Sequence, residues 1–194
     1  MGHIIDYVNE YGRYTLDREP FNEVDSLVLS QFSYLKFDRI LKGDGSEGKT
    51  MQVGELKDSK DYETLFSDSR FEKSNRSLFE AMAGSRRFSS VRLYDHVNIV
   101  DPKWEIQFSA ITCVFDNGFT YIAYRGTDET ITGWKEDFNM SFITPVPAQE
   151  KAVQYLNRMG TKIASGFAVG GHSKGGNLAV YASMMCREQV MKIL

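Results

Sequence analysis

One short segment near the C-terminus constrains the fold more than any other part of the chain. Gly171, Ser173 and Gly175 form the pattern Gly-x-Ser-x-Gly, with an apolar run (166–170) before it and a helical segment (177–187) after it. A serine at so sharp a strand-to-helix turn needs a positive φ, and the positions two before and two after it face the neighbouring backbone. The segment therefore predicts a buried strand, a tight turn that projects the Ser173 hydroxyl, and a helix. The alternative is a glycine-rich turn whose serine only caps the helix.

The rest of the chain predicts an α/β fold. Besides the helix at 177–187, apolar residues recur at helical spacing in five segments: 4–11, 22–35, 74–83 (with Gly84 as its C-terminal stop), 131–142 and 148–164. β-branched and aromatic residues predict strands at 91–100, 104–115 and 119–124, with a hairpin turn at 116–118. Residues 189–194 favour one further strand. We therefore expect a single domain over 1–194, in which 1–90 is mainly helix and loop and 91–194 holds the sheet and the serine turn.

Composition excludes several classes of protein. The 194 residues are 42% hydrophobic and 25% charged, which is typical of a globular domain. A net charge of −3 gives no basic surface for nucleic acid, and no apolar run is long enough to cross a membrane. The N-terminus lacks the pattern of a signal peptide, and Cys113 and Cys186 are expected to be reduced thiols, so we expect a cytoplasmic protein. No cofactor is predicted.

A second motif offers an alternative binding site. Residues 43–50, GDGSEGKT, match the phosphate-loop pattern G-x-x-x-x-G-K-[ST] at every fixed position. The flanks disagree with that interpretation, because a helical stripe precedes the motif and no apolar helix face follows it. Asp44 and Glu47 would also place carboxylates where phosphate should lie. We expect a solvated loop, with nucleotide binding as the less favoured alternative.

A loop after the strand at 119–124 completes a pattern with the serine turn. The segment YRGTD (124–128), followed by Trp134 and later by GHSKGG (171–176), resembles the class 3 lipases, which are α/β-hydrolases. The form GHSKGGNLA, with PFNEVDSLVLSQFSYL near the N-terminus, more closely resembles a bacterial lipase-like family of unknown function over nearly the whole chain. Lys174 is a departure, because class 3 lipases usually carry Leu there.

The resemblance implies roles for individual residues. Ser173 would be the nucleophile, and the backbone N–H groups of Thr127 and Lys174 would form the oxyanion hole. Arg125 would be structural, bonding backbone or a buried carboxylate, and Asp128 would cap its loop. The side chain of Lys174 is expected to be solvated.

Two further features near the motifs carry expectations. His172 is expected to point away from Ser173 and to pack in the core. Ile131, Trp134 and Phe138 would form either a lid over an acyl pocket or part of the core.

The base and acid of a catalytic triad are missing from the expected place. In α/β-hydrolases both follow the serine in the chain, but after Ser173 there is no His or Asp, only Glu188. His96 lies upstream in a predicted strand and is not expected to serve as the base. We therefore expect the N-terminal portion of a longer α/β-hydrolase, with its C-terminal strands missing and an exposed sheet edge that favours self-association.

The functional expectation follows from these points. The full-length protein would be an esterase- or lipase-like serine hydrolase acting on a small-molecule ester or lipid. The alternative is a non-catalytic lipase-like binding module.

Overall fold

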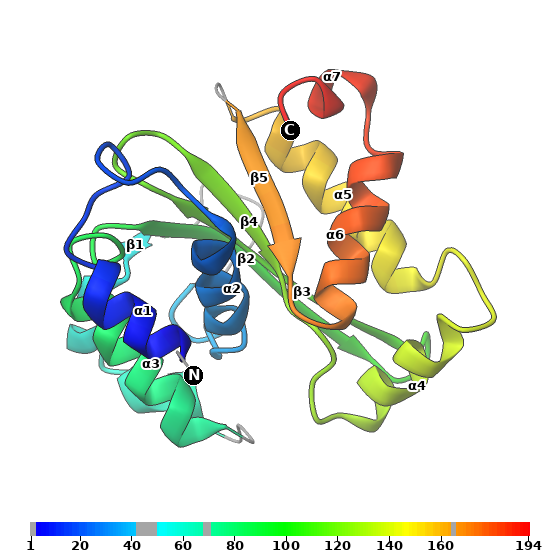
Figure 1. Ribbon diagram of the computed structural model, residues 1–194. Coiled ribbons are helices and arrows are strands. Elements are labelled where there is room, and N and C mark those ends of the chain that lie inside the picture. The colour runs from blue at the N-terminus through cyan, green and yellow to red at the C-terminus, as the bar shows by residue number, and fades with distance from the viewer. Residues whose placement is uncertain (1–2, 42–49, 68–70, 164–165) are drawn as a thin grey trace.

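The structure is a computed structural model that describes residues 3–41, 50–67, 71–163 and 166–194. These residues form a five-stranded sheet with helices on both faces (Figure 1). The chain is therefore an α/β protein, as the sequence predicts. The phosphate-loop motif at 43–50 lies outside the described residues, apart from Thr50.

The strands follow one another in the sheet in the order of the chain, β1 to β5. Their bounds are β1 (Met51–Gln52), β2 (Arg92–Asp101), β3 (Ile106–Val114), β4 (Thr120–Tyr124) and β5 (Phe167–Gly171). The first four pair antiparallel, and Gly118 takes a φ of +88° in the predicted turn between β3 and β4. β5 pairs parallel with β4, with Tyr124 opposite Gly171. The carboxyl ends of β4 and β5 therefore meet at the same end of the sheet.

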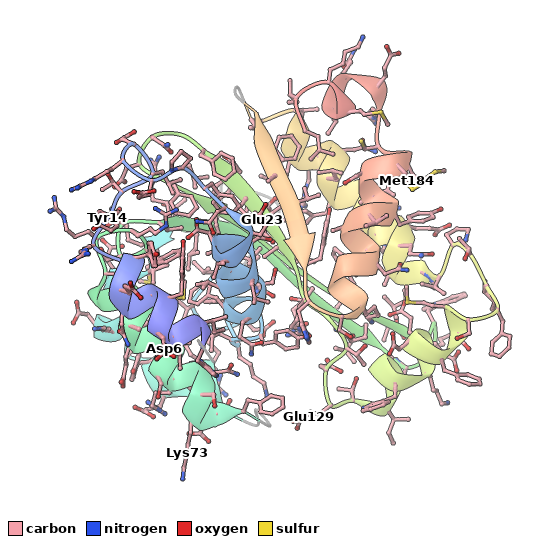
Figure 2. All side chains as sticks on the ribbon, in the orientation of Figure 1. Asp6, Tyr14, Glu23, Lys73, Glu129 and Met184 are labelled. Atoms are coloured by element: carbon pink, nitrogen blue, oxygen red, sulfur yellow. The ribbon has the colours of Figure 1, made fainter. Side chains whose placement is uncertain are left out.

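The helices divide between the two faces of the sheet (Figure 1), and Figure 2 shows their side chains in the same orientation. One face carries α1 (Ile4–Tyr11), α2 (Glu23–Phe32), α3 (Glu72–Gly84) and the short 3-10 helices η1 (Gly54–Asp58) and η2 (Tyr62–Phe66). The other face carries α5 (Pro147–Gly160) and α6 (Lys174–Met185), followed by the short α7 (Glu188–Met191). Helix α4 (Ile131–Asn139) lies beyond the carboxyl ends of β4 and β5.

The sheet separates two apolar cores because side chains alternate between the faces of a strand. In β4, Tyr121 and Ala123 pack against α1–α3, whereas Ile122 and Tyr124 pack against α5 and α6. All of these side chains are fully buried. The central strand that leads to the YRGTD loop is therefore held from both sides.

A buried ion pair fixes the N-terminal layer. Arg87 follows α3, and its Nε donates to Asp25 Oδ1 over 2.7 Å, while its Nη2 also pairs with Asp25. Both side chains are fully buried. Asp25 also accepts from the Tyr7 hydroxyl and from the Asn22 backbone N–H at the start of α2. This pair joins three segments that are distant in sequence.

Two expectations about segment ends are wrong. Gly84 lies inside the last turn of α3, and Ser85 follows it as the C-cap, so this helix ends without a left-handed glycine. Residues 189–194 form no strand, because residues 188–191 are helix α7. Val190 of α7 packs on Gly160, where a Cβ would lie 2.6 Å from the nearest valine methyl. A short apolar run does not by itself distinguish a strand from a helical turn.

None of the helices in the described residues is long and apolar enough to cross a membrane.

Candidate active site

The turn between β5 and α6 holds Ser173 in a conformation that few side chains adopt. Its φ is 56° and its ψ is −126°, and it is one of three non-glycine residues with positive φ among the described residues. Such a backbone costs of order 1–3 kcal/mol and is found most often at functional sites. Ser173 is exposed, and its side chain makes no capping hydrogen bond to α6. The alternative of a simple capping serine is therefore wrong.

The two flanking glycines are required by close backbone contacts. A Cβ on Gly171 would lie 2.4 Å from the carbonyl oxygen of Tyr124 and 2.4 Å from the carbonyl carbon of Gly175. A Cβ on Gly175 would lie 2.1 Å from the same Tyr124 oxygen. Glycine is therefore required two residues before and two residues after the serine because backbone atoms occupy the space of a Cβ, as the pattern predicts. The turn formed by residues 171–175, called the elbow below, packs directly on the end of β4.

The loop after β4 contacts the elbow through Gly126. A Cβ at this position would lie 2.5 Å from the carbonyl oxygen of His172 and 3.4 Å from the Cβ of Ser173. The Arg125 N–H also donates to the Ser109 carbonyl over 2.9 Å, which extends the sheet pairing into the loop. The structure therefore brings the YRGTD segment beside Ser173, as the two motifs together predict.

Thr127, the predicted oxyanion residue, has an unused polar group. Its Oγ1 is buried and has no hydrogen-bond partner among the described residues. A buried hydroxyl without a partner costs about 1–3 kcal/mol, and such groups often have a functional cause. The Thr127 hydroxyl can therefore donate a hydrogen bond to a ligand, and it lies next to Gly126, which contacts the elbow.

The structural role predicted for Arg125 and the loop-capping role predicted for Asp128 are confirmed, but the first partner of Arg125 is a side-chain amide and not the backbone or a buried carboxylate. The Arg125 guanidinium is buried, and its Nη2 donates to Asn98 Oδ1 over 2.8 Å and to Asp128 Oδ2 over 3.4 Å. Asp128 Oδ1 accepts from the backbone N–H and the hydroxyl of Thr130, the N-cap of α4. Together these contacts hold the loop between β4 and α4.

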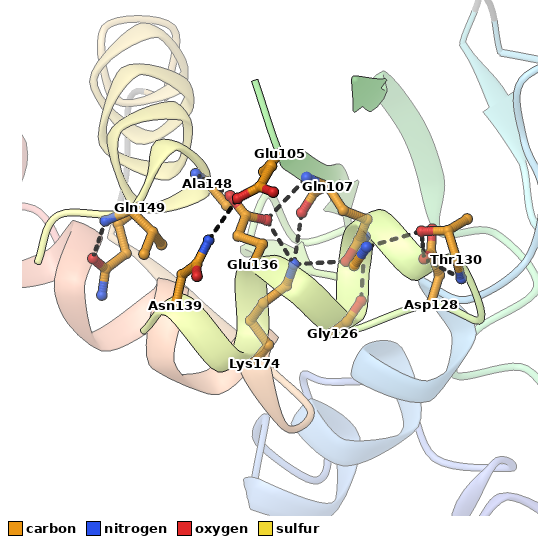
Figure 3. Close-up of polar contacts among 12 residues, drawn as sticks. Glu105, Gln107, Gly126, Asp128, Thr130, Glu136, Asn139, Ala148, Gln149 and Lys174 are labelled. Carbon is orange, nitrogen blue, oxygen red and sulfur yellow. Dashed lines mark hydrogen bonds and ion pairs between the residues drawn. The ribbon is translucent and has the colours of Figure 1, made fainter. Parts of the chain in front are cut away.

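The expectation of a solvated Lys174 side chain is wrong. Its ammonium is fully buried and donates to Gln107 and to Glu136 of α4, with which it forms an ion pair of 2.9 Å (Figure 3). Burial lowers the pKa of Lys174, while the charge of Glu136 acts in the opposite direction. Because Lys174 begins a helix directly after an exposed serine, the sequence predicts an exposed side chain. In the structure β3 and α4 cover it.

The expectation that His172 packs in the core is also wrong. The residue is exposed rather than packed in the core, and its Nδ1 lies 3.2 Å from the hydroxyl of Tyr34. The same hydroxyl lies 2.3 Å from the position of a Cβ on Gly126, so Tyr34 lies against both the loop after β4 and the elbow. Burial raises the pKa of Tyr34 and keeps it a neutral hydroxyl. Sequence reasoning missed Tyr34, which follows the apolar stripe of α2 without any motif of its own.

Helix α4 exposes its apolar side chains. Ile131, Trp134 and Phe138 are 77%, 62% and 67% exposed, and Phe142 beyond the helix is 74% exposed. The interpretation of these residues as core is therefore wrong. The buried residues of α4 are instead Thr132, Gly133 and Glu136. Whether the exposed face acts as a lid stays a prediction.

No histidine among the described residues is bonded to Ser173. His96 lies in β2 at a register shift, is buried against Phe37, and its Nε2 has no partner among the described residues. Burial lowers the pKa of His96 to about 4. A surface depression of about 760 Å³ is also remote from the elbow, since its lining comes from Arg39, Ile40, Met51 and residues 58–61.

The comparisons with known proteins gave one match. A family model described as Mbeg1-like matches residues 82–194, a segment that contains β2–β5, α4, α5 and the serine elbow with α6. No curated protein and no solved structure matches the chain.

Proposed function

The chain belongs to the Mbeg1-like family, and we propose that its elbow is the nucleophile site of an esterase- or lipase-like serine hydrolase. The observation that carries the proposal is the backbone of Ser173. An exposed serine with a φ of 56° stands between two glycines whose Cβ atoms would collide with Tyr124 or with the elbow itself. A turn with such demands on three residues is the arrangement that presents a serine hydroxyl to a substrate.

The backbone N–H groups of Thr127 and Lys174 are the proposed oxyanion donors. Lys174 is the first residue of α6, and N–H groups in the first turn of a helix have no acceptor within the helix. The positive end of the helix dipole adds to their effect. Gly126 lies against Ser173 and brings the Thr127 loop beside it, and the Thr127 hydroxyl, which has no partner in the part of the chain that the structure describes, supports the same site.

The chemistry would be acyl transfer from an ester. The Ser173 oxygen attacks the ester carbonyl carbon while a base takes its proton, and the carbonyl oxygen gains the negative charge that the two N–H groups stabilise. The intermediate then collapses, the leaving oxygen takes the proton back from the base and departs as the alcohol, and water, losing a proton to the same base, cleaves the acyl-serine ester to release the acid and the free serine. Helices on both faces of the sheet, and an elbow at the carboxyl end of β5, support an α/β-hydrolase-like and class 3 lipase-like arrangement.

Nucleophilic capture and turnover make different demands on the protein. Capture of an activated electrophile needs Ser173, the oxyanion donors and one acceptor for the serine proton, which buffer base can supply, whereas turnover needs a positioned base in both of its steps. Because no described histidine is bonded to Ser173, the sharpest test measures capture.

The test is covalent labelling by a fluorophosphonate. The Ser173 oxygen should displace fluoride from phosphorus and add one phosphonyl group to the intact protein, with the adduct located on the peptide that contains residue 173. The Ser173→Ala variant should not be labelled. The Ser141→Ala variant, which removes another exposed serine, should be labelled like the wild type. Equal labelling of Ser173→Ala, or no adduct on residue 173 in the wild type, would refute the proposal.

A non-catalytic binding module is the second candidate. The exposed apolar side chains of α4 favour it, because an apolar face of this kind can bind an acyl chain without any chemistry. Binding of a long-chain ester that is unchanged in Ser173→Ala and weakened in Trp134→Ala, without phosphonate labelling, would select this candidate.

A further inference from the structure

We propose that the Lys174 side chain is a positioning residue that holds the oxyanion loop and helix α4 in place against the elbow. The inference rests on the proposed function, since the position of the loop matters to chemistry only if Ser173 reacts. It concerns the ammonium group, whereas the oxyanion role of Lys174 concerns its backbone N–H.

The ammonium group has three acceptors, which match its three N–H donors. Its Nζ donates to the Gln107 carbonyl oxygen over 2.8 Å, to Gln107 Oε1 over 2.6 Å and to Glu136 Oε2 over 2.9 Å (Figure 3). The side chains of Lys174 and Glu136 are both fully buried. The residue next to the nucleophile is thus tied to β3 and α4 by directed contacts.

Gln107 transmits this contact to the oxyanion loop. An ammonium group can only donate, so it requires the oxygen of the Gln107 amide to face Lys174. The amide nitrogen must then face the other way, where Nε2 donates to the Gly126 carbonyl over 3.4 Å. Gly126 directly precedes Thr127. Removing the ammonium removes the reason for the amide to hold this orientation.

Glu136 transmits the contact to α4 and α5. Its Oε2 also accepts from the Gln107 N–H over 2.9 Å, and its Oε1 accepts from the Ala148 N–H over 2.8 Å. Helix α4 buries no large apolar side chain, because its buried residues are Thr132, Gly133 and Glu136. This helix is therefore held mainly by polar contacts, and the pair with Lys174 is central among them.

Stability alone does not account for a buried ion pair at this place. Two buried charges lose their hydration, and apolar groups of similar volume are often as stable or more stable. Apolar groups form no hydrogen bonds, and the hydrogen bonds of this pair are what align Gln107, Gly126 and the elbow.

The experiment compares three variants of the intact chain. Lys174→Met removes the ammonium and leaves Glu136 as an unpaired buried charge. Lys174→Met with Glu136→Gln removes both charges and keeps one of the two acceptor oxygens, so that one of the Gln107 and Ala148 N–H groups retains its partner. Lys135→Met is the control, because Lys135 lies beside Glu136 in α4 but is 60% exposed in its side chain.

Three readouts separate position from folding: the unfolding midpoint in urea, the phosphonylation rate of Ser173, and amide hydrogen exchange over residues 125–139. Lys174→Met should be less stable, react about 100-fold more slowly and exchange faster in this segment, because a misplacement of about 1 Å costs that much in rate. The double variant should recover part of the lost stability, because no buried charge is left unpaired, while the rate stays low and the exchange stays fast. Lys135→Met should match the wild type.

Each other outcome decides against the proposal or against its premise. Recovery of the rate together with stability in the double variant would show a merely structural role. A folded Lys174→Met with wild-type rate and exchange would overturn the proposal, as would failure of both variants to fold. If wild-type Ser173 does not react at all, the proposed function fails, and the exchange over residues 125–139 still decides whether Lys174 positions the loop and α4.

Discussion

Gly175→Ala is the substitution that tests the elbow most directly. It adds one methyl group in the first turn of α6, and that carbon would lie 2.1 Å from the carbonyl oxygen of Tyr124 and 3.0 Å from its carbonyl carbon. Both atoms belong to the backbone at the end of β4, opposite Gly171 of β5. The neighbouring atoms are not a flexible side chain, so either α6 or the end of β4 must move.

The expected cost follows from two opposed effects. Relieving the contact needs a backbone shift of about 1 Å. The free-energy cost of such a shift should be ~3 kcal/mol, the upper end of the range found for overpacked cores. Alanine gains about 1 kcal/mol over glycine in a helix. The free energy of unfolding should therefore fall by ~2 kcal/mol. With a urea dependence of about 2 kcal/mol per molar, the midpoint should fall by ~1 M.

The assay is urea unfolding followed by circular dichroism, with Gly84→Ala as the matched control. Gly84 lies in the last turn of α3, and a Cβ there would meet nothing within 4 Å. This control should be neutral or stabilising by up to ~1 kcal/mol. Gly175→Ala should also slow the phosphonylation of Ser173, because the displaced turn carries the nucleophile. A Gly175→Ala midpoint equal to or above that of the wild type would refute the reasoning.

Three further predictions concern buried polar and thiol groups. Burial lowers the pKa of His96 to about 4, so between pH 6.5 and 4 the unfolded chain binds a proton at His96 that the folded chain does not, and the free energy of unfolding should fall by about 3 kcal/mol over this range. Urea midpoints measured across the same range should depend much less on pH in His96→Gln than in the wild type. Arg87→Met leaves the buried carboxylate of Asp25 unpaired and should cost about 3–5 kcal/mol in urea unfolding, whereas the exposed Arg18→Met should change little; equal effects would contradict the buried pair. Cys113 is fully buried and its pKa is raised to about 12, so in a Cys186→Ser background a thiol reagent should modify it only as fast as the protein unfolds; rapid reaction in the fold would disprove its burial.

The sequence alone determined the local features of the elbow. The apolar run, the spacing of Gly171, Ser173 and Gly175, and the following helix are contiguous, and backbone sterics dictate what such a run can form. Strands β2 to β5, most α-helices and the turn at Gly118 were predictable for the same reason, because periodicity and turn chemistry act over a few residues, whereas the two-residue strand β1 carries no such signal. The match between the YRGTD loop and the elbow was predictable only because both motifs were recognisable separately.

The tertiary structure alone decided how distant side chains combine around the elbow. Lys174 is buried because β3 and α4 close over it and supply its three acceptors, and nothing within its own helix indicates this. Tyr34, just after the C-terminal end of α2, contacts His172, and Arg87 pairs with Asp25, which lies 62 residues earlier in the chain. The burial of a polar group is affordable only when partners arrive from other segments to satisfy it. Those partners are set by packing, so the sequence pattern around each residue could not show them.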